Sequence, residues 1–254
     1  MKYFMRILFS IFIIGDGLWA TDLVVGTTSA YAPFVSLDEQ GQYVGFDIDI
    51  AEELANKLGR SLVIKDLGSM PALFLALKQN KVDLLIWAIS ITEERQKQME
   101  MIYYQGEKVI ALPLLFWKQI PDKITSIEEM ANVPNGVISV EAGSFAESFL
   151  LSVPGLNLKQ VDKVMDSLLE LKYGKSLATM VDPSLLTTIL EKFPEIKVLN
   201  IPLPPSAQAL GYGICVNKSN QTLIAQVKQA VAELRSAGKI AELERKWNLT
   251  RSDQ

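Results

Sequence analysis

The chain lacks histidine entirely and has a single cysteine, Cys215. Without histidine neither a Ser-His-Asp nor a Cys-His catalytic arrangement can form, and the usual zinc sites lose a common ligand. One cysteine excludes an intrachain disulfide, and its place in an apolar run, 212–216, is typical of a buried structural thiol. We therefore predict no catalytic residue, no metal site and no cofactor.

Strong charge of either sign is also missing. The 254 residues include 25 basic and 29 acidic side chains, a net charge of −4. No basic stripe is visible, so nucleic acid is not expected as a partner. Hydrophobic residues make up 49% of the chain, enough to bury the core of one large or two medium domains.

The N-terminus differs from the rest of the chain. Lys2 and Arg6 precede an apolar run at 7–14, and the small residue Ala20 follows. This pattern predicts a secretory signal peptide over residues 1–20; an uncleaved amphipathic segment is the alternative. No cysteine lies near the predicted cleavage point, so a lipid anchor is not supported.

The stretch from Asp83 to Arg95 contains the most informative pattern. Residues 84–86 form a short apolar run that predicts a strand buried on both faces. Thr92 is a plausible N-cap of a helix running to about Met101. Arg95 lies in the first turn of that helix, where a cation opposes the helix dipole. A guanidinium at the carboxyl end of a strand indicates a ligand, because ligands of α/β sheets bind there.

Strands and helices are predicted to alternate along the chain. This order predicts right-handed βαβ units and a parallel sheet, repeated in a second unit, and hence an α/β fold. A proline-rich segment at 201–205 is expected to mark a boundary. The predicted strands cover 23–25, 61–67, 84–86, 136–140 and 177–181, and helices cover 46–58, 71–78, 146–151, 166–172 and 221–249.

Several short motifs occur in a specific order. They are Tyr31-Ala32-Pro33-Phe34, Gly45 to Ile50, Ser90 to Arg95, Gly143-Ser144 after a strand, and Asp182 after a later strand. Together they resemble the periplasmic amino-acid-binding proteins of polar amino-acid ABC importers, over residues 22 to 249. Arginine-binding relatives from obligate intracellular bacteria look similar around 173–176 and 210–213.

The resemblance implies a two-lobed periplasmic-binding-protein-like fold of type II, with two crossover strands forming a hinge. Lobe 1 would comprise 22–108 plus 209–254, and lobe 2 would comprise 109–208. It also implies a periplasmic, monomeric protein that is not an enzyme. Its partners would be a free amino acid and an inner-membrane ABC permease with its ATPase.

The resemblance further implies roles at the ligand's main-chain groups. Arg95 would clamp the α-carboxylate with two parallel hydrogen bonds. Ser90 would add its hydroxyl and N–H, and Ser144 would offer N–H groups from a helix start. Asp182 would neutralise the α-ammonium, toward which Ala88 would turn its carbonyl.

Side-chain specificity is predicted from departures from the family pattern. Tyr31 and Met70 would sandwich the ligand's side chain, where relatives usually carry aromatics. Thr28 stands where relatives that bind basic amino acids often carry an acid. Trp87 replaces a small residue and could stack on a guanidinium or simply narrow the pocket. Since an unpaired buried cation is costly, the sequence favours glutamine, with arginine close behind.

Each assignment has a structural alternative. Arg95 could form a surface salt bridge, Asp182 before Pro183 fits a helix N-cap, and Tyr31 and Met70 could be plain packing residues. Asp47 and Asp49 form a carboxylate pair, but residues two apart on a helix point in different directions. They are therefore predicted to stabilise the helix N-terminus.

Two other function classes stay open beside the importer component. An enzyme on the same fold, resembling cyclohexadienyl dehydratases, would need an acid or base in the cleft beyond the ligand clamps. A ligand-sensing module would normally be fused to membrane helices and signalling domains.

Overall fold

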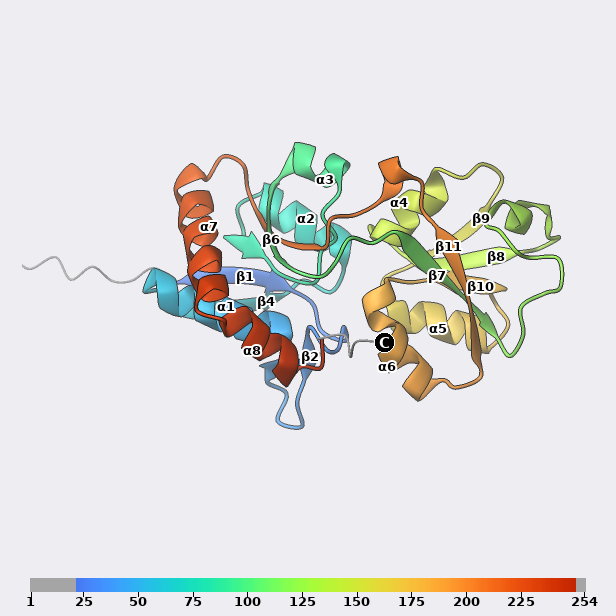
Figure 1. Cartoon of the computed structure of the whole chain (residues 1–254), viewed down its shortest axis with the longest axis horizontal. Coiled ribbons are helices and arrows are strands. Elements are labelled where there is room, and N and C mark those ends of the chain that lie inside the picture. Colours follow the sequence, from blue (N-terminus) through green and yellow to red (C-terminus); the bar gives the residue numbers. More distant parts are fainter. Residues whose placement is uncertain (1–21, 250–254) are drawn as a thin grey trace, which may run out of the picture.

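The computed structural model describes residues 22–249 and contains two five-stranded sheets that lie side by side (Figure 1). The first sheet has the order β4-β1-β5-β12-β6 and the second the order β11-β7-β10-β8-β9. Helices flank both sheets, so the chain forms two α/β lobes. The predicted signal peptide, 1–20, lies outside the described residues.

The first lobe combines the N-terminal part of the chain with its C-terminal part. β1 pairs in parallel with β4 and β5, whereas β12 pairs antiparallel with both β5 and β6. The parallel sheet predicted from the βαβ order is therefore correct for three strands and wrong for the other two. The strands are β1 (Leu23–Thr27), β4 (Leu62–Asp66), β5 (Leu84–Leu85), β6 (Glu100–Gln105) and β12 (Tyr212–Val216); β2 (Ser36–Leu37) and β3 (Tyr43–Val44) form a separate hairpin.

Helices cover the first sheet as the apolar periodicity predicted. In α7, all five residues expected on one face are buried: Leu223, Ile224, Val227, Val231 and Leu234. The helices of this lobe are α1 (Phe46–Leu58), α2 (Met70–Lys78), α3 (Glu93–Gln98), α7 (Gln221–Ser236) and α8 (Lys239–Lys246).

One helix is shorter than expected. α3 ends at Gln98 rather than near Met101, and residues 100–105 form β6 instead. The partner of β6 is β12, more than a hundred residues further along the chain. Because pairing with a distant strand decides the conformation here, the local pattern could not predict it.

The second lobe contains three strands that were not predicted, β7, β9 and β11. β11 is an edge strand that pairs only with β7, and an edge tolerates the proline of residue 202. The elements are β7 (Ala111–Trp117), β8 (Val137–Glu141), β9 (Asn157–Val161), β10 (Ala178–Met180), β11 (Ile196–Pro202), α4 (Phe145–Leu151), α5 (Val164–Lys172), α6 (Leu186–Lys192) and the 3-10 turns η1 (Glu128–Asn132), η2 (Pro183–Leu185) and η3 (Pro205–Ala207).

Two chain segments connect the lobes. One leads from β6 into β7 and the other returns from β11 to β12 (Figure 1). Val109 and Ala209 form an antiparallel bridge where these segments pass each other. These two residues begin the predicted segments 109–208 and 209–254. We therefore place the hinge at the two segments that connect the lobes.

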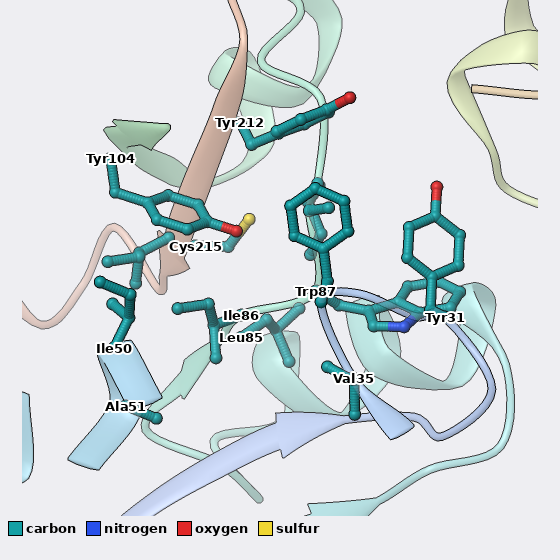
Figure 2. Close-up of a cluster of buried hydrophobic side chains, with 14 of the residues drawn as sticks. Tyr31, Val35, Ile50, Ala51, Leu85, Ile86, Trp87, Tyr104, Tyr212 and Cys215 are labelled. Atoms are coloured by element: carbon teal, nitrogen blue, oxygen red, sulfur yellow. The ribbon is translucent and has the colours of Figure 1, made fainter. Parts of the chain in front are cut away.

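Apolar packing extends over both lobes. Cys215 is fully buried in β12, as expected for a structural thiol (Figure 2). A single cluster of buried hydrophobic residues joins the first lobe to Leu168, Leu171 and Leu185 of the second. The lobes are therefore in contact. Within residues 22–249, none of the helices has the length and apolarity needed to cross a membrane.

Candidate functional site

A cavity lies between the two lobes and is lined by residues from both. Its volume is about 20 Å³, well below that of an open ligand pocket, so the side chains of the two lobes nearly fill the space between them. Seven of the eight predicted site residues line it; only Trp87 does not. The lining residues are Tyr31, Met70, Ala88, Ser90, Arg95, Glu141, Ser144, Phe145, Ala146, Val164, Met180, Val181 and Asp182.

Arg95 reaches this cavity from the first turn of α3. Thr92 caps the helix by accepting the Arg95 N–H at 3.3 Å, as predicted. The side chain is only 8% exposed and forms no ion pair with any residue in 22–249, so the surface salt-bridge alternative is wrong. Its burial lowers the pKa of the guanidinium, which nevertheless stays charged.

The guanidinium of Arg95 donates hydrogen bonds to both lobes. Nη1 donates to the carbonyl of Ser90 at 2.8 Å, and Nη2 donates to the carbonyl of Gly143 in the second lobe at 2.8 Å. The ring of Phe74 lies beneath it, 5.4 Å from the central carbon. The planar group is thereby held at the cavity wall in one orientation.

Ala88 occupies a strained backbone position at the cavity. Its φ is +42°, in the left-handed region that a residue with a Cβ adopts at a cost. Its N–H donates to Oδ2 of Asp47 at 2.8 Å, and the Tyr104 hydroxyl donates to Oδ1 at 2.6 Å. Asp47 is fully buried, which raises the pKa of its carboxyl to about 7.

The role predicted for Asp47 therefore needs correction. It lies in the first turn of α1, but its carboxyl oxygens accept hydrogen bonds from the Ala88 N–H and the Tyr104 hydroxyl. Asp49, by contrast, accepts hydrogen bonds from Lys246 and Trp247 of the C-terminal segment. Asp47 thus positions the backbone of the site, and Asp49 ties α1 to the end of α8.

Asp182 combines the two roles weighed for it. It caps η2 through Oδ1, which accepts the Ser184 N–H at 2.9 Å and the Ser184 hydroxyl at 2.6 Å. Oδ1 also accepts the hydroxyl of Tyr212 from the first lobe. Oδ2 faces Ser90 Oγ across the cavity at 3.5 Å. One oxygen is therefore structural, and the other is directed toward the site.

The geometry at Ser144 changes its predicted contribution. Ser144 caps α4 by accepting the Glu147 N–H at 3.0 Å, and its own N–H donates to the Glu141 carbonyl at 3.2 Å. The Gly143 N–H is bound by the Glu147 carboxylate at 2.7 Å. The donors that remain toward the cavity, within the described chain, are the N–H groups of Phe145 and Ala146.

The aromatic residues divide into lining and supporting positions. Tyr31 lines the cavity, with its ring 4.8 Å from that of Trp87 (Figure 2). The hydroxyl groups of Tyr31 and Tyr212 point out of the buried cluster, whereas Trp87 lies behind Tyr31 and is 2% exposed. Trp87 is therefore a supporting residue, and the predicted stacking of its indole on a ligand cation has no open face here. Met70 lines the cavity and accepts from Arg95 Nη2 at 3.4 Å.

Among the described residues, Glu141 is the one charged residue lining the cavity that was not predicted from the sequence. It ends β8, is 5% exposed, and burial raises the pKa of its carboxyl to about 8. The signal was present: an acidic residue directly follows a buried apolar strand, the pattern that drew attention to Arg95. The neighbouring Gly143-Ser144 motif took precedence, and Glu141 was passed over.

The charged groups of the cavity suit an α-amino acid. Arg95 from one lobe and Asp182 from the other can bind the carboxylate and ammonium of a zwitterion. Carbonyl, hydroxyl and N–H groups around them add polar partners. Among residues 22–249, no group of three histidine, cysteine, aspartate or glutamate side chains has a metal-binding arrangement.

Comparison with known proteins agrees with this geometry. Residues 23–250 match the family model of bacterial extracellular solute-binding proteins, family 3. The chain belongs to this family. The probable ABC transporter arginine-binding protein ArtJ of Chlamydia trachomatis serovar D is 37% identical over 228 residues, covering 89% of this chain and 85% of the relative.

Solved structures confirm the predicted two-lobed periplasmic-binding-protein-like fold for this family 3 protein. An ancestral arginine-binding protein bound to arginine has a TM-score of 0.77 and 29% identity, covering 90% of this chain and 98% of that one. The ancestral arginine-binding protein bound to glutamine has a TM-score of 0.77 and 30% identity, covering 90% and 97%.

Proposed function

We propose that this protein is the extracytoplasmic binding component of an amino-acid ABC importer. It captures a free polar L-amino acid, arginine or glutamine, between its lobes and delivers it to a permease with its ATPase. One observation carries the proposal: Arg95 and Asp182 line the same cavity from opposite lobes. A zwitterion that engages both residues joins the lobes, so ligand binding and closure are coupled.

The main-chain clamp assigns each group of the ligand. The α-carboxylate is bound by Arg95 Nη2, Ser90 and the N–H groups of Phe145 and Ala146. The α-ammonium is bound by Asp182 Oδ2 and by the carbonyl of Ala88, whose N–H is already held by Asp47. Tyr31 and Met70 flank the side chain.

Family membership and the predicted signal peptide support the setting that we propose. The protein acts in the periplasm as a monomer, and its permease and ATPase are separate chains. The arginine-binding relative from Chlamydia trachomatis is named as an ABC transporter protein. This supports transport rather than catalysis.

A thermal-shift screen tests the proposal. The purified, ligand-stripped protein is heated with each free amino acid in turn. A ligand that binds only the folded state stabilises it by mass action and so raises the melting temperature. At a ligand concentration of about 100 times Kd, the free energy of unfolding increases by about 2.7 kcal/mol. One or two amino acids should stand out; if no amino acid shifts the melt, the proposal is wrong.

The enzyme alternative draws on one observation, the buried carboxyl of Glu141 in the cavity. A carboxyl with a pKa raised to about 8 is protonated near neutral pH and can act as a general acid. Turnover of prephenate-like cyclic carboxylic acids by the purified protein, lost in Glu141→Gln, would favour this alternative over transport.

A further inference from the structure

Glu141 lines the cavity from the second lobe. It is the last residue of β8, and the cavity-lining Phe145 and Ala146 follow on α4. The opposite wall carries Tyr31; burial, and then the nearby carboxylates of Asp182 and Glu141, raise the pKa of its phenol. The Glu141 carboxylate therefore faces the cavity opposite the aromatic wall.

The carboxylate has few partners in the protein. The backbone N–H of Val164 donates to it. It forms no ion pair with any residue in 22–249, and its nearest charged neighbours across the cavity are Arg95 and Asp182. Burying an acidic group with one neutral donor is costly, unless a cation or a proton completes its surroundings.

The charges of the residues that line the cavity indicate which group supplies that cation. The charged residues lining the cavity are Arg95, Asp182 and Glu141, one cation against two carboxylates. The α-carboxylate of a ligand uses Arg95, and its α-ammonium uses Asp182. Glu141 is left over: beside a neutral side chain its buried carboxyl keeps its proton at neutral pH, whereas a cationic side chain can pair with the ionised carboxylate. A ligand with a cationic side chain makes the closed site neutral.

The first lobe offers no substitute for this acid. Thr28, at the position where an acid would be expected for a basic ligand, is 1% exposed and does not line the cavity. Trp87 is buried behind Tyr31. The preference for glutamine rested on the lack of an acid at Thr28, and it did not take into account an acid in the opposite lobe.

We propose that Glu141 determines specificity by pairing with the cationic side chain of the ligand, so that the substrates are basic amino acids with a guanidinium group, arginine first. A guanidinium suits the site because its planar fork can donate twice to one carboxylate while its face lies against the ring of Tyr31. This inference rests on the proposed amino-acid-binding function.

Isothermal titration calorimetry with matched ligands tests the pairing. L-Arginine and L-citrulline have nearly the same shape, but citrulline replaces the guanidinium with a neutral urea group. L-Glutamine serves as a shorter neutral ligand. The variants are Glu141→Gln, which removes the charge at constant size, and Glu128→Gln, which removes one charge from an exposed position of the same lobe.

The expected result is specific to the pair. The unmodified protein and Glu128→Gln should bind arginine at least 100-fold more tightly than citrulline. Glu141→Gln should lose most of that preference while keeping or improving its affinity for citrulline and glutamine. The comparison of arginine with citrulline on the unmodified protein needs no variant, so it remains decisive if Glu141→Gln folds poorly.

Other outcomes separate the two proposals. Tighter binding of glutamine or citrulline than of arginine by the unmodified protein would overturn the role of Glu141 and leave the amino-acid-binding function intact. An arginine preference that survives in Glu141→Gln would do the same. Failure of every free amino acid to bind would overturn the proposed function itself.

Discussion

Tyr212 of the first lobe donates its hydroxyl to Oδ1 of Asp182 in the second lobe, so these two residues link the lobes directly. The same oxygen accepts both donors of Ser184, while Oδ2 faces the cavity. The carboxylate thus serves helix capping, lobe contact and the proposed ammonium site at once. Substitutions at its three hydrogen-bond partners, Tyr212, Ser184 and Ser90, can separate these functions.

Asp182→Asn should weaken amino-acid binding by about 30- to 5000-fold, because removing one member of a buried charge pair costs about 2–5 kcal/mol. Calorimetry measures the loss. Ser184→Ala is the control: it removes one cap donor but keeps the carboxylate, and affinity should change less than about fivefold. Asp182→Asn that retains affinity but unfolds at lower temperature would show that the residue acts as a cap alone.

Arg95→Lys should reduce affinity by at least tenfold although the positive charge is retained. An ammonium cannot reproduce the two hydrogen bonds that the guanidinium fork makes in different directions. Arg95→Ala should abolish binding and also lower the melting temperature, since the Ser90 and Gly143 carbonyls each lose a donor. Equal affinity in Arg95→Lys and the unmodified protein would contradict the clamp.

Gly143→Ala should oppose lobe closure. A Cβ at Gly143 would lie 3.3 Å from Pro71 Cδ and 3.4 Å from Met70 Cβ in the other lobe. We expect weaker binding and a smaller ligand-induced decrease in radius of gyration by small-angle X-ray scattering. Gly174→Ala is the matched control, because Gly174 also has a positive φ in the same lobe, with nothing within 4 Å. Equal affinity losses in both variants would point to backbone strain alone.

At pH 8, where Asp47 is ionised in the folded protein, Asp47→Asn should lower the free energy of unfolding by about 1–3 kcal/mol, because an amide cannot accept from both Ala88 and Tyr104 with the strength of a carboxylate. Tyr104→Phe should cost a similar amount, and the double variant should cost less than the sum. Urea denaturation gives all three values. Asp49→Asn, at the same helix end, should be much milder. A loss as large in Asp49→Asn would restore the helix-dipole interpretation for both residues.

Stability should fall as the pH rises from about 5 to 8. Burial raises the pKa of Asp47 from 3.8 to about 7 and that of Glu141 from 4.5 to about 8, so in this range the folded state holds protons that the unfolded chain has lost. Each group then contributes a loss of at most about 1.4 kcal/mol per pH unit.

Chemical denaturation at pH 5, 6, 7 and 8 measures this dependence. Near Glu141 the other charged or titratable groups are Arg95, Asp182 and Tyr31, and near Asp47 they are Tyr104, Tyr212 and Tyr31. Asp47→Asn combined with Glu141→Gln should flatten the profile. If the free energy of unfolding of the unmodified protein rose with pH over this range, Asp47 and Glu141 would not be buried in their protonated forms.

Two cavity-lining residues were predicted from the sequence by different routes. Arg95 places a cation in the first turn of a helix, which indicated a ligand, whereas Asp182 before a proline fits a helix N-cap and was assigned to the site by the family resemblance. Trp87 could not be placed in the same way. Residues 87 and 88 are adjacent, and only the fold decides that residue 88 lines the cavity while residue 87 packs behind Tyr31.

The parts of the fold that escaped prediction depend on distant partners. β6 follows a helix so closely that its residues resemble a helix continuation, and only pairing with β12 makes them a strand. β11 ends within the proline-rich segment 201–205 and is a strand because β7 lies beside it. Asp47 was misassigned for a related reason: its partners Ala88 and Tyr104 lie 41 and 57 residues away.

The hydrogen bond from Arg95 to the Gly143 carbonyl uses a donor that the proposed ligand carboxylate also requires. The Gly143 carbonyl therefore competes with the ligand carboxylate for Arg95 within the same molecule, and this competition does not depend on any concentration in the cell. A molecule that has closed through this hydrogen bond must release it before Arg95 can bind the ligand carboxylate, which lowers the measured affinity in proportion to the fraction of molecules in that state. The solute level at which uptake begins would then be set partly by how well one glycine carbonyl satisfies one arginine.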